Sequence, residues 1–434
     1  MFKKKTLKIY LLALSSSSIF AQNNDSLKTE VGKLRTDVDV LKNLKVNGWV
    51  QAQFQWADSA GVKNFDGGDF LPGSDKRFMI RRGRVKFTYN QKNSQYVLQI
   101  NATERGINLT DFYGKVTDPW KHLFSLTAGV MNRPFGYEIQ QSSSDRETPE
   151  RSRFTQTLFP NERDLGAMLT FQPGKDKKLY GLKIDAGMYG GTGIAVPGTT
   201  SASNGVNDFD QFKDFIGRAS YTKSLKEDKI KFGIGLSHYN GGVVCQNNKV
   251  YNKLVSDSLG NKMFALADTA GSSFKGKAAP RKYVGADFQF SIVSSIGTTT
   301  IRGEYITGTQ PRTIHETKSP AAMPAKPNTY IRNFNAGDFY FVQRLGKSKH
   351  ELVVKYDWYD PNTKLAGKEI SSKNGMTKAE VKYTSLGLGY VMYFDTNIKF
   401  MLYYNMVTNE KTNVSGYTKD IRDNILTLRM QYRF

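Results

Sequence analysis

Alternation of apolar and polar residues constrains this chain more than any other feature, and it recurs in separate stretches between residue 46 and residue 434. The stretch "VNGWVQAQFQW" places Val50, Phe54 and Trp56 on one face and three glutamines on the other. Because successive side chains of a β-strand point to opposite faces, a period of two predicts two-faced strands. Sixteen such stretches are expected, at 46–56, 77–89, 95–103, 108–117, 123–131, 163–173, 179–189, 212–223, 229–240, 281–292, 297–308, 334–345, 349–360, 381–394, 397–408 and 421–434.

The connections between these stretches alternate in length. Short polar links such as "NQKNS", "GKDKK" and "DT" alternate with long segments at 132–162, 190–211, 241–280 and 309–333. An even strand number, with tight turns at one end and long loops at the other, predicts an all-β fold, a transmembrane antiparallel β-barrel of about 16 strands in the outer membrane of a Gram-negative bacterium. Soluble β-sandwiches do not normally alternate their connections in this way. No run approaches the roughly 18 consecutive apolar residues of a membrane-spanning helix.

The outward faces and the last strand fit a lipid environment. Ile398, Phe400 and Leu402, for example, share one uncharged face. The final stretch "NILTLRMQYRF" alternates up to Phe434, and we expect it to pair with the first strand, because an open sheet edge cannot face hydrocarbon. A terminal Phe with Tyr432 before it resembles the signal by which the barrel-assembly machinery recognises outer-membrane proteins. Outer-membrane lipid and this machinery are therefore expected partners.

Two segments precede the barrel. Residues 1–21 combine a Lys-rich start with a short apolar run and read as a secretory signal peptide. Residues 22–45 carry apolar residues spaced four, three, four and three apart, with charges between them, which predicts a helix with a coiled-coil seam. This seam consists of Leu27, Val31, Leu34, Val38 and Leu41. A short coiled coil between several copies and a helix docked on its own barrel both fit this pattern.

The polar faces of the strands are strongly basic. On the parity that faces the lumen we place thirteen cations, which are Arg81, Arg84, Lys86, Lys115, Lys183, Arg218, Lys231, Arg302, Arg344, Lys355, Lys399, Arg429 and Arg433. Five acids oppose them, namely Asp111, Asp185, Asp287, Glu304 and Asp357. A basic interior with low-dielectric walls concentrates anions. The sequence therefore predicts a water-filled channel that prefers small anionic solutes.

One stretch breaks its own alternation. In "RFMIRRGRVKFTY", Phe78 and Ile80 have the opposite parity to Val85, so one extra residue must be absorbed near Arg81, Arg82 and Gly83. A β-bulge at the glycine would absorb it. Two adjacent arginines would then point toward the pore, where guanidinium groups bind phosphate or carboxylate with two hydrogen bonds.

The same region resembles a known family. "RFMIRRGRVKF", "LTDFYGKV", "LTAGVMNRPFGYE", "SSSDRETPERS" and "FPNERDLGAML" are similar, in that order, to the signature of the phosphate-selective porins O and P. The resemblance implies a sixteen-stranded homotrimeric outer-membrane porin, with an inward constriction loop at about 132–162 that begins at "NRPFG" and a barrel over 46–434. Parity and resemblance together give the expected pore-lining and anion-binding set: Arg81, Arg82, Arg84, Lys86, Lys115, Arg133, Arg151, Arg153, Arg218, Arg302, Arg344 and Lys355.

Other function classes find little support in the sequence. A barrel enzyme needs a nucleophile or carboxylate with a positioned base, yet His122 and His350 fall in expected turns, His315 falls in a long loop, and His238 has outward parity without a nearby acid. No Cys or His pair has metal-ligand spacing. We therefore expect no enzyme activity, cofactor, metal or nucleic-acid partner. A barrel that serves as a docking component of an envelope complex stays an alternative.

Overall fold

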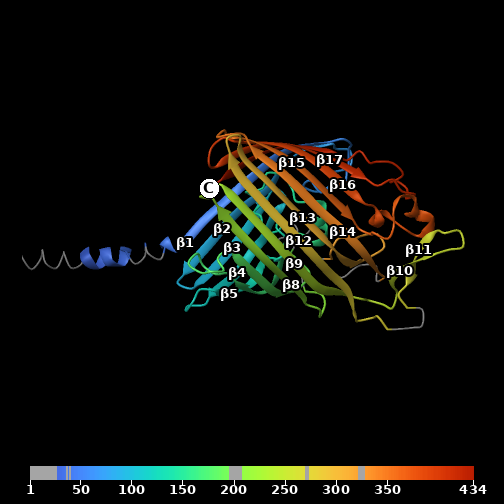
Figure 1. Cartoon of the computed structure of the whole chain (residues 1–434), viewed down its shortest axis with the longest axis horizontal. Coiled ribbons are helices and arrows are strands. Elements are labelled where there is room, and N and C mark those ends of the chain that lie inside the picture. The colour runs from blue at the N-terminus through green and yellow to red at the C-terminus, as the bar shows by residue number, and fades with distance from the viewer. Residues whose placement is uncertain (1–26, 36–37, 39–40, 195–207, 269–272, 321–327) are drawn as a thin grey trace, which may run out of the picture.

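Sixteen antiparallel strands close into a barrel in the computed structural model of the chain, which describes residues 27–35, 38, 41–194, 208–268, 273–320 and 328–434 (Figure 1). Each barrel strand pairs with the next, β9 pairs with β12, and β18 pairs with β1. The predicted fold class is confirmed. The barrel strands are β1 (Leu44–Ala57), β2 (Lys76–Gln91), β3 (Ser94–Thr103), β4 (Gly106–Thr117), β5 (Phe124–Asn132), β6 (Arg163–Phe171), β7 (Leu182–Tyr189), β8 (Asp214–Leu225), β9 (Ile230–Val244), β12 (Ala278–Ser294), β13 (Gly297–Arg312), β14 (Thr329–Arg344), β15 (His350–Asp360), β16 (Tyr383–Tyr393), β17 (Ile398–Asn409) and β18 (Ile425–Arg433).

The last strand closes the barrel against the first. The register runs from Trp49 opposite Arg433 to Ala57 opposite Ile425. Gly48 and Phe434 extend it, since each backbone N–H donates to the carbonyl of the other at 3.0 Å. The expected pairing of the terminal strand is confirmed, and both barrel termini lie at the end with the short turns. We call this end the turn end and the opposite one the loop end.

Side chains alternate across the wall as the sequence predicts. On β1, Gln51, Gln53 and Gln55 are buried toward the lumen, whereas Val50 and Trp56 are 40% and 51% exposed on the outside. β18 shows the same pattern, with buried Thr427, Arg429 and Gln431 on its inner face. The outer surface therefore presents an apolar belt suited to hydrocarbon, and polar groups line the interior.

The extra residue of β2 lies at Arg81. Gln51 pairs with Arg82 and the next residue, Ala52, pairs with Ile80, so Arg81 has no partner on β1. The prediction of one inserted residue is confirmed, but its placement at Gly83 is wrong. Gly83 stays in register opposite Val50, and it is needed for a different reason: a Cβ there would lie 2.3 Å from the carbonyl oxygen of Ala102.

A hairpin that the sequence did not predict rises from the loop end. β10 (Val250–Ser256) and β11 (Lys262–Leu266) form within the expected loop 241–280, and β10 runs parallel to the start of β14. A two-stranded hairpin is marginal alone. Here Leu254 and Phe264 pack against Leu365 and Ile370 of the β15–β16 loop, which also contains the short 3-10 helices η1 (Gly367–Glu369), η2 (Ser372–Asn374) and η3 (Lys378–Glu380). Packing between loops, rather than local alternation, stabilises these elements.

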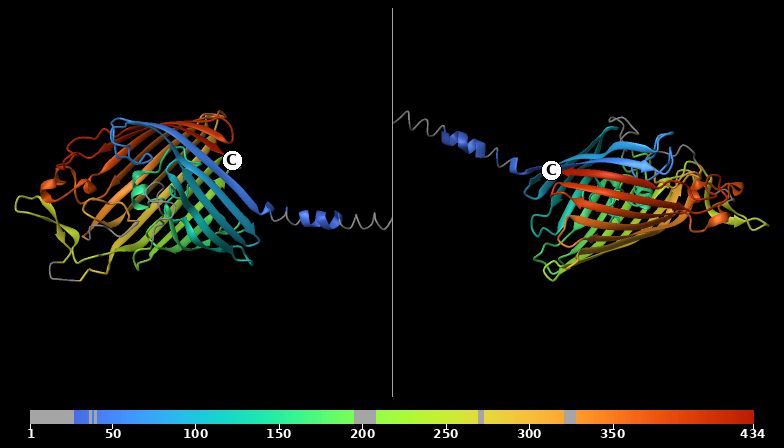
Figure 2. Two further views of the ribbon diagram at one scale, coloured as in Figure 1. Left: turned by 180° about the vertical axis from the view of Figure 1, so that it is seen from behind. Right: turned by 90° about the horizontal axis from the view of Figure 1, so that it is seen from above.

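The long loop between β5 and β6 turns into the barrel instead of leaving it (Figure 2). It spans residues 133–162 and contains the helix α2 (Arg153–Leu158). Across the described ranges, no helix combines the length and apolar character needed to cross a membrane.

The segment before the barrel is partly described. The expected signal peptide, 1–21, lies outside the described residues. Residues 27–35 are helical, and all five seam residues are exposed, from 42% at Val31 to 63% at Leu27. A single copy of the chain therefore leaves this apolar seam uncovered. Figure 1 shows the helix at the turn end, where β1 begins.

Candidate functional site in the barrel lumen

An aromatic cluster fixes one side of the inward loop to the wall. The rings of Phe135 and Phe159 in the loop are in tilted contact, with centroids 5.0 Å apart. Phe159 contacts the rings of Tyr239 on β9 and Tyr283 on β12 at 5.9 and 5.7 Å. Fourteen buried apolar residues form this cluster, so the loop has a packed core of its own against the wall.

The start of the loop is held by a buried carboxylate and a glycine. Glu304 Oε2 on β13 accepts hydrogen bonds from the backbone N–H groups of Tyr137, at 2.9 Å, and Glu138, at 3.1 Å. Gly136 adopts φ +58°, and a Cβ there would lie 1.9 Å from Glu304 Oε1. Only glycine permits this approach, which explains the last residue of the "NRPFG" motif.

Glu138 organises the middle of the loop. Its carboxylate accepts hydrogen bonds from the backbone N–H of Ser152 at 2.8 Å and from the Tyr340 hydroxyl at 2.7 Å. The ammonium group of Lys355, on β15, lies 3.8 Å from Glu138 and 3.3 Å from Asp357. Strands β14 and β15 therefore hold this part of the loop by polar contacts.

The opposite side of the loop reaches the wall near the barrel closure. Lys399 Nζ on β17 donates to the carbonyl oxygens of Ser144 and Arg146, both at 2.8 Å. Gln431 on β18 donates to the Ser144 carbonyl at 3.0 Å, and Gln51 on β1 donates to the Ser143 carbonyl at 2.9 Å. The loop thus spans the lumen from β9–β15 to β17, β18 and β1.

Three wall arginines converge on one loop carboxylate. Arg81 binds Glu150 with two parallel hydrogen bonds, Nε to Oε1 at 2.8 Å and Nη2 to Oε2 at 2.9 Å. Arg82 Nη2 donates to Oε2 at 2.8 Å, and Arg429 Nη2 donates to Oε1 at 3.0 Å. Glu150 is 4% exposed. We call Arg81, Arg82 and Arg429 the three-arginine clamp.

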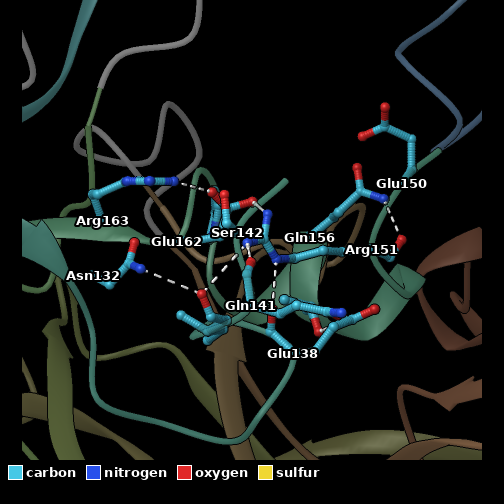
Figure 3. Close-up of polar contacts among 12 residues, drawn as sticks. Asn132, Glu138, Gln141, Ser142, Glu150, Arg151, Gln156, Glu162 and Arg163 are labelled. Carbon is cyan, nitrogen blue, oxygen red and sulfur yellow. Dashed lines mark hydrogen bonds and ion pairs between the residues drawn. The ribbon is translucent and has the colours of Figure 1, made fainter. Parts of the chain in front are cut away.

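A second cluster of charged residues, Arg151, Glu162 and Arg163, links the first part of the loop to its last residues (Figure 3). Glu162 pairs with Arg151 and, at 2.7 Å, with Arg163, which also binds Asp111 of β4 at 2.9 Å. Arg151 donates to the carbonyl oxygens of Glu138 and Gln141, both at 2.9 Å. These contacts use most of the hydrogen-bonding capacity of Arg151.

Other members of the expected anion-binding set are also engaged. Arg302 binds Glu147 with Nη1 at 3.1 Å from Oε1, and Arg218 binds Asp287 at 2.7 Å. Arg133 donates to the Pro160 carbonyl at 3.0 Å and lies over the Phe159 ring. The guanidinium carbon of Arg153 lies over the ring of Tyr383, 3.6 Å from its centroid. Most of these cations therefore anchor the loop or bind wall acids.

A smaller group of lumen cations forms no salt bridge within the described part of the chain, although carboxylates attract two of them: Glu162 and Asp111 attract Arg84, and Glu351 lies opposite Arg344 on β15. Lys86 on β2 and Lys115 on β4 are half-buried on the inner face and form no ion pair there. Arg84 lies 5.6 Å from the Trp49 ring centroid, and its Nε has no hydrogen-bond partner among the described residues. Arg344 donates to the Ser348 carbonyl rather than to a carboxylate. All four lie in the half of the barrel toward the turn end.

Sequence reasoning missed three acids of the inner wall. Asp214, Asp338 and Glu351 also point inward and are buried. Their parity within the strands was the signal that could have identified them. Asp214 pairs with Arg281 of β12, and Glu380 of the β15–β16 loop pairs with Arg332 of β14 at 2.7 Å. The last pair joins a strand to a distant loop, which no local pattern reveals.

A small pocket lies beside the clamp. It is lined by the loop that follows β1, by the inward loop and by strands β15–β17: Asn64, Phe65, Asp66, Glu150, Arg151, Arg153, Lys355, Asp357, Ser385, Tyr403, Asn405 and Val407. Glu150 is therefore both bound by the clamp and part of a pocket wall. In the described ranges no three His, Cys, Asp or Glu side chains gather in a way that could hold a metal ion.

Comparisons with known proteins agree with this architecture. Residues 50–239 match the model of the phosphate-selective porin O and P family, so the resemblance predicted from the sequence is confirmed. The outer-membrane channel DcaP of Acinetobacter baumannii is similar in fold, with TM-score 0.53 and 11% identity over 90% of this chain and 97% of that one. Outer-membrane expressed OmpT of Vibrio cholerae has TM-score 0.49 and 8% identity, over 90% and 97%. No curated protein matches the chain significantly. The family model thus matches the first part of the barrel, and DcaP shares the barrel fold.

Proposed function

We propose that this protein is an outer-membrane porin, a diffusion channel for small anionic solutes, phosphate among them. The observation that carries this proposal is the group of lumen cations that form no salt bridge within the described residues, namely Arg84, Lys86, Lys115 and Arg344. Cations held by loop and wall carboxylates contribute little net field, whereas these four do. Low-dielectric walls focus such a field along the lumen and raise the local concentration of anions.

Neutralising the two lysines tests this function. Lys86→Gln with Lys115→Gln removes two positive charges that hold no structural partner in the described chain. The reversal potential in a tenfold KCl gradient should shift toward lower anion preference. The matched control is Lys92→Gln with Lys121→Gln, which removes two exposed charges from turns outside the lumen. Equal shifts in both variants, or none in either, would contradict the assignment of lumen charge.

The proposal includes the assembly of the porin. We propose that residues 1–21 direct export, that residues 22–45 lie in the periplasm, and that the protein is a homotrimer. The exposed seam at Leu27, Val31, Leu34, Val38 and Leu41 supports the trimer, because uncovered apolar residues in heptad spacing are those that a coiled coil buries. Recognition by the barrel-assembly machinery would use the strand that ends at Phe434.

A docking barrel in an envelope complex is the second candidate function. The loop contacts both sides of the wall, and this observation favours a barrel whose lumen is filled. A channel gives stepwise currents in a planar bilayer, whereas a filled docking barrel gives none. We prefer the channel because the unpaired lumen cations have no structural use in a filled barrel.

A further inference from the structure

The three-arginine clamp has the geometry of a binding site for one carboxylate. Arg81 presents its Nε and Nη2 as a fork to the two oxygens of Glu150, and Arg82 and Arg429 add one close donor to each oxygen. A planar guanidinium matches the two oxygens of a planar carboxylate in this way. The donors come from β2 and β18, whereas the carboxylate comes from the inward loop. The wall therefore holds the site, and the chain's own Glu150 occupies it.

Arg146, in the same loop as Glu150, is a buried arginine that lacks such hydrogen-bonded partners within the described residues. Arg146 is 1% exposed, and its Nε, Nη1 and Nη2 all lack a hydrogen-bond partner within the described residues. Leaving a buried guanidinium without hydrogen bonds is costly. Arg146 is four residues before Glu150 in the same loop, and the two charges attract each other.

We propose that Arg81, Arg82 and Arg429 bind the carboxylate of a permeating solute, which displaces Glu150 from the clamp onto Arg146. This inference rests on the proposed anion channel and names the class of solute that its lumen recognises. Before the exchange Glu150 is paired and Arg146 is not. After it, the solute pairs with the clamp and Glu150 pairs with Arg146, so both buried charges have partners.

The position of Glu150 makes such an exchange feasible. The pocket beside the clamp is lined by the acids Glu150, Asp66 and Asp357 and by the cations Arg151, Arg153 and Lys355. Glu150 therefore borders an open space in which an arriving anion can contact three cations. Competition by Glu150 also limits how long the solute stays, because the tethered carboxylate can return. Conduction requires binding of this reversible kind.

The experiment measures how anions block chloride current through single channels at constant ionic strength. In the unmodified porin, acetate should reduce the current at lower concentrations than inorganic phosphate, because the clamp fits a planar two-oxygen anion. Glu150→Gln removes the tethered competitor, so the apparent affinity for acetate should rise on the order of tenfold or more. Arg146→Met removes the alternative partner of Glu150, so that affinity should fall.

Two further readouts keep the test decisive. If Glu150→Gln does not assemble, the inference is tested by comparing Arg146→Met with the conservative variant Arg146→Lys. Acetate should still block the chloride current through Arg146→Lys, but not through Arg146→Met. Unchanged acetate affinity in both Arg146 variants would overturn the inference, as would phosphate blocking as well as acetate. The reversal potential, measured in the same experiment, reports anion preference whether or not Glu150 moves. It therefore distinguishes a failure of the clamp inference from a failure of the proposed anion channel.

Discussion

At the scale of single residues, ion pairs between loop carboxylates and arginines position the inward loop in the lumen. Glu147, Glu150 and Glu162 each pair with arginines of the wall or of the loop's own ends. Charges buried in this way are stable only when they are paired and hydrogen-bonded. The near balance of acids and bases in the loop therefore fixes its position across the lumen, and in the proposed channel the selectivity would depend on the cations that form no salt bridge.

A single carboxylate also stabilises the β4–β5 turn at the turn end. Asp118 accepts backbone N–H hydrogen bonds from Lys121, Leu123 and Phe124 at 2.7, 2.6 and 2.8 Å. These hydrogen bonds favour the charged form and hold the pKa of Asp118 well below its usual range. Because the pKa is lowered on folding, the stabilisation is present above the usual aspartate pKa. It is lost only as the pH falls through the lowered value.

Asp118→Asn should therefore loosen this turn without unfolding the barrel. At neutral pH, we expect the amides of residues 121–124 to exchange hydrogen several-fold faster than in the parent, and the difference should persist down to about pH 4. Asp395→Asn is the matched control, because Asp395 accepts two backbone N–H bonds in another turn. Equal exchange at 121–124 in parent and Asp118→Asn would refute the role given to this side chain.

At the scale of elements, local alternation predicted the barrel strands because each strand has one face in lipid and one in the lumen. It failed at β10 and β11, where the hairpin depends on contacts with the β15–β16 loop. It also placed the bulge at Gly83 rather than Arg81, since parity shows that a residue is inserted but not which one. Parity placed Arg302 and Lys355 on the inner wall, but their pairing with the loop arises from chain segments far apart in sequence.

The two ends of the barrel differ in exposure to labelling reagents if this topology is correct. Cys245 is buried with Val250 and Ala279, so the natural thiol is a poor target for a labelling reagent. In a Cys245→Ala background, Leu259→Cys in the β10–β11 turn should react with an impermeant thiol reagent on intact cells. Trp120→Cys, at an equally exposed position (85% for both side chains), should react only after lysis. Labelling of Trp120→Cys before lysis, without labelling of Leu259→Cys, would reverse the orientation.

At the scale of the whole molecule, the barrel, the inward loop and the N-terminal helix make separate contributions. In the proposed function, the barrel supplies the passage, the loop narrows it, and the exposed seam offers a surface for other copies. Three heptads are too short to be stable alone, so the helix should assist contacts between barrels rather than replace them.

Assembly can be tested on the seam itself. Val31→Asp with Leu34→Asp should lower the temperature at which the detergent-solubilised oligomer dissociates, because charge is introduced into an apolar contact. Thr29→Asp with Gly32→Asp adds the same charge away from the seam and should have a smaller effect. Equal dissociation temperatures for the two double variants would show that the seam is not an interface between copies.

The sign of the reversal potential of the unmodified protein tests the central claim most directly. In a planar bilayer with a tenfold KCl gradient, the unpaired cations Arg84, Lys86, Lys115 and Arg344 predict stepwise currents and a reversal potential that shows chloride preference. Raising the salt should weaken this preference, since the screening length falls to about 3 Å at 1 M. A cation-preferring potential, or a barrel that inserts but passes no current, would contradict the account.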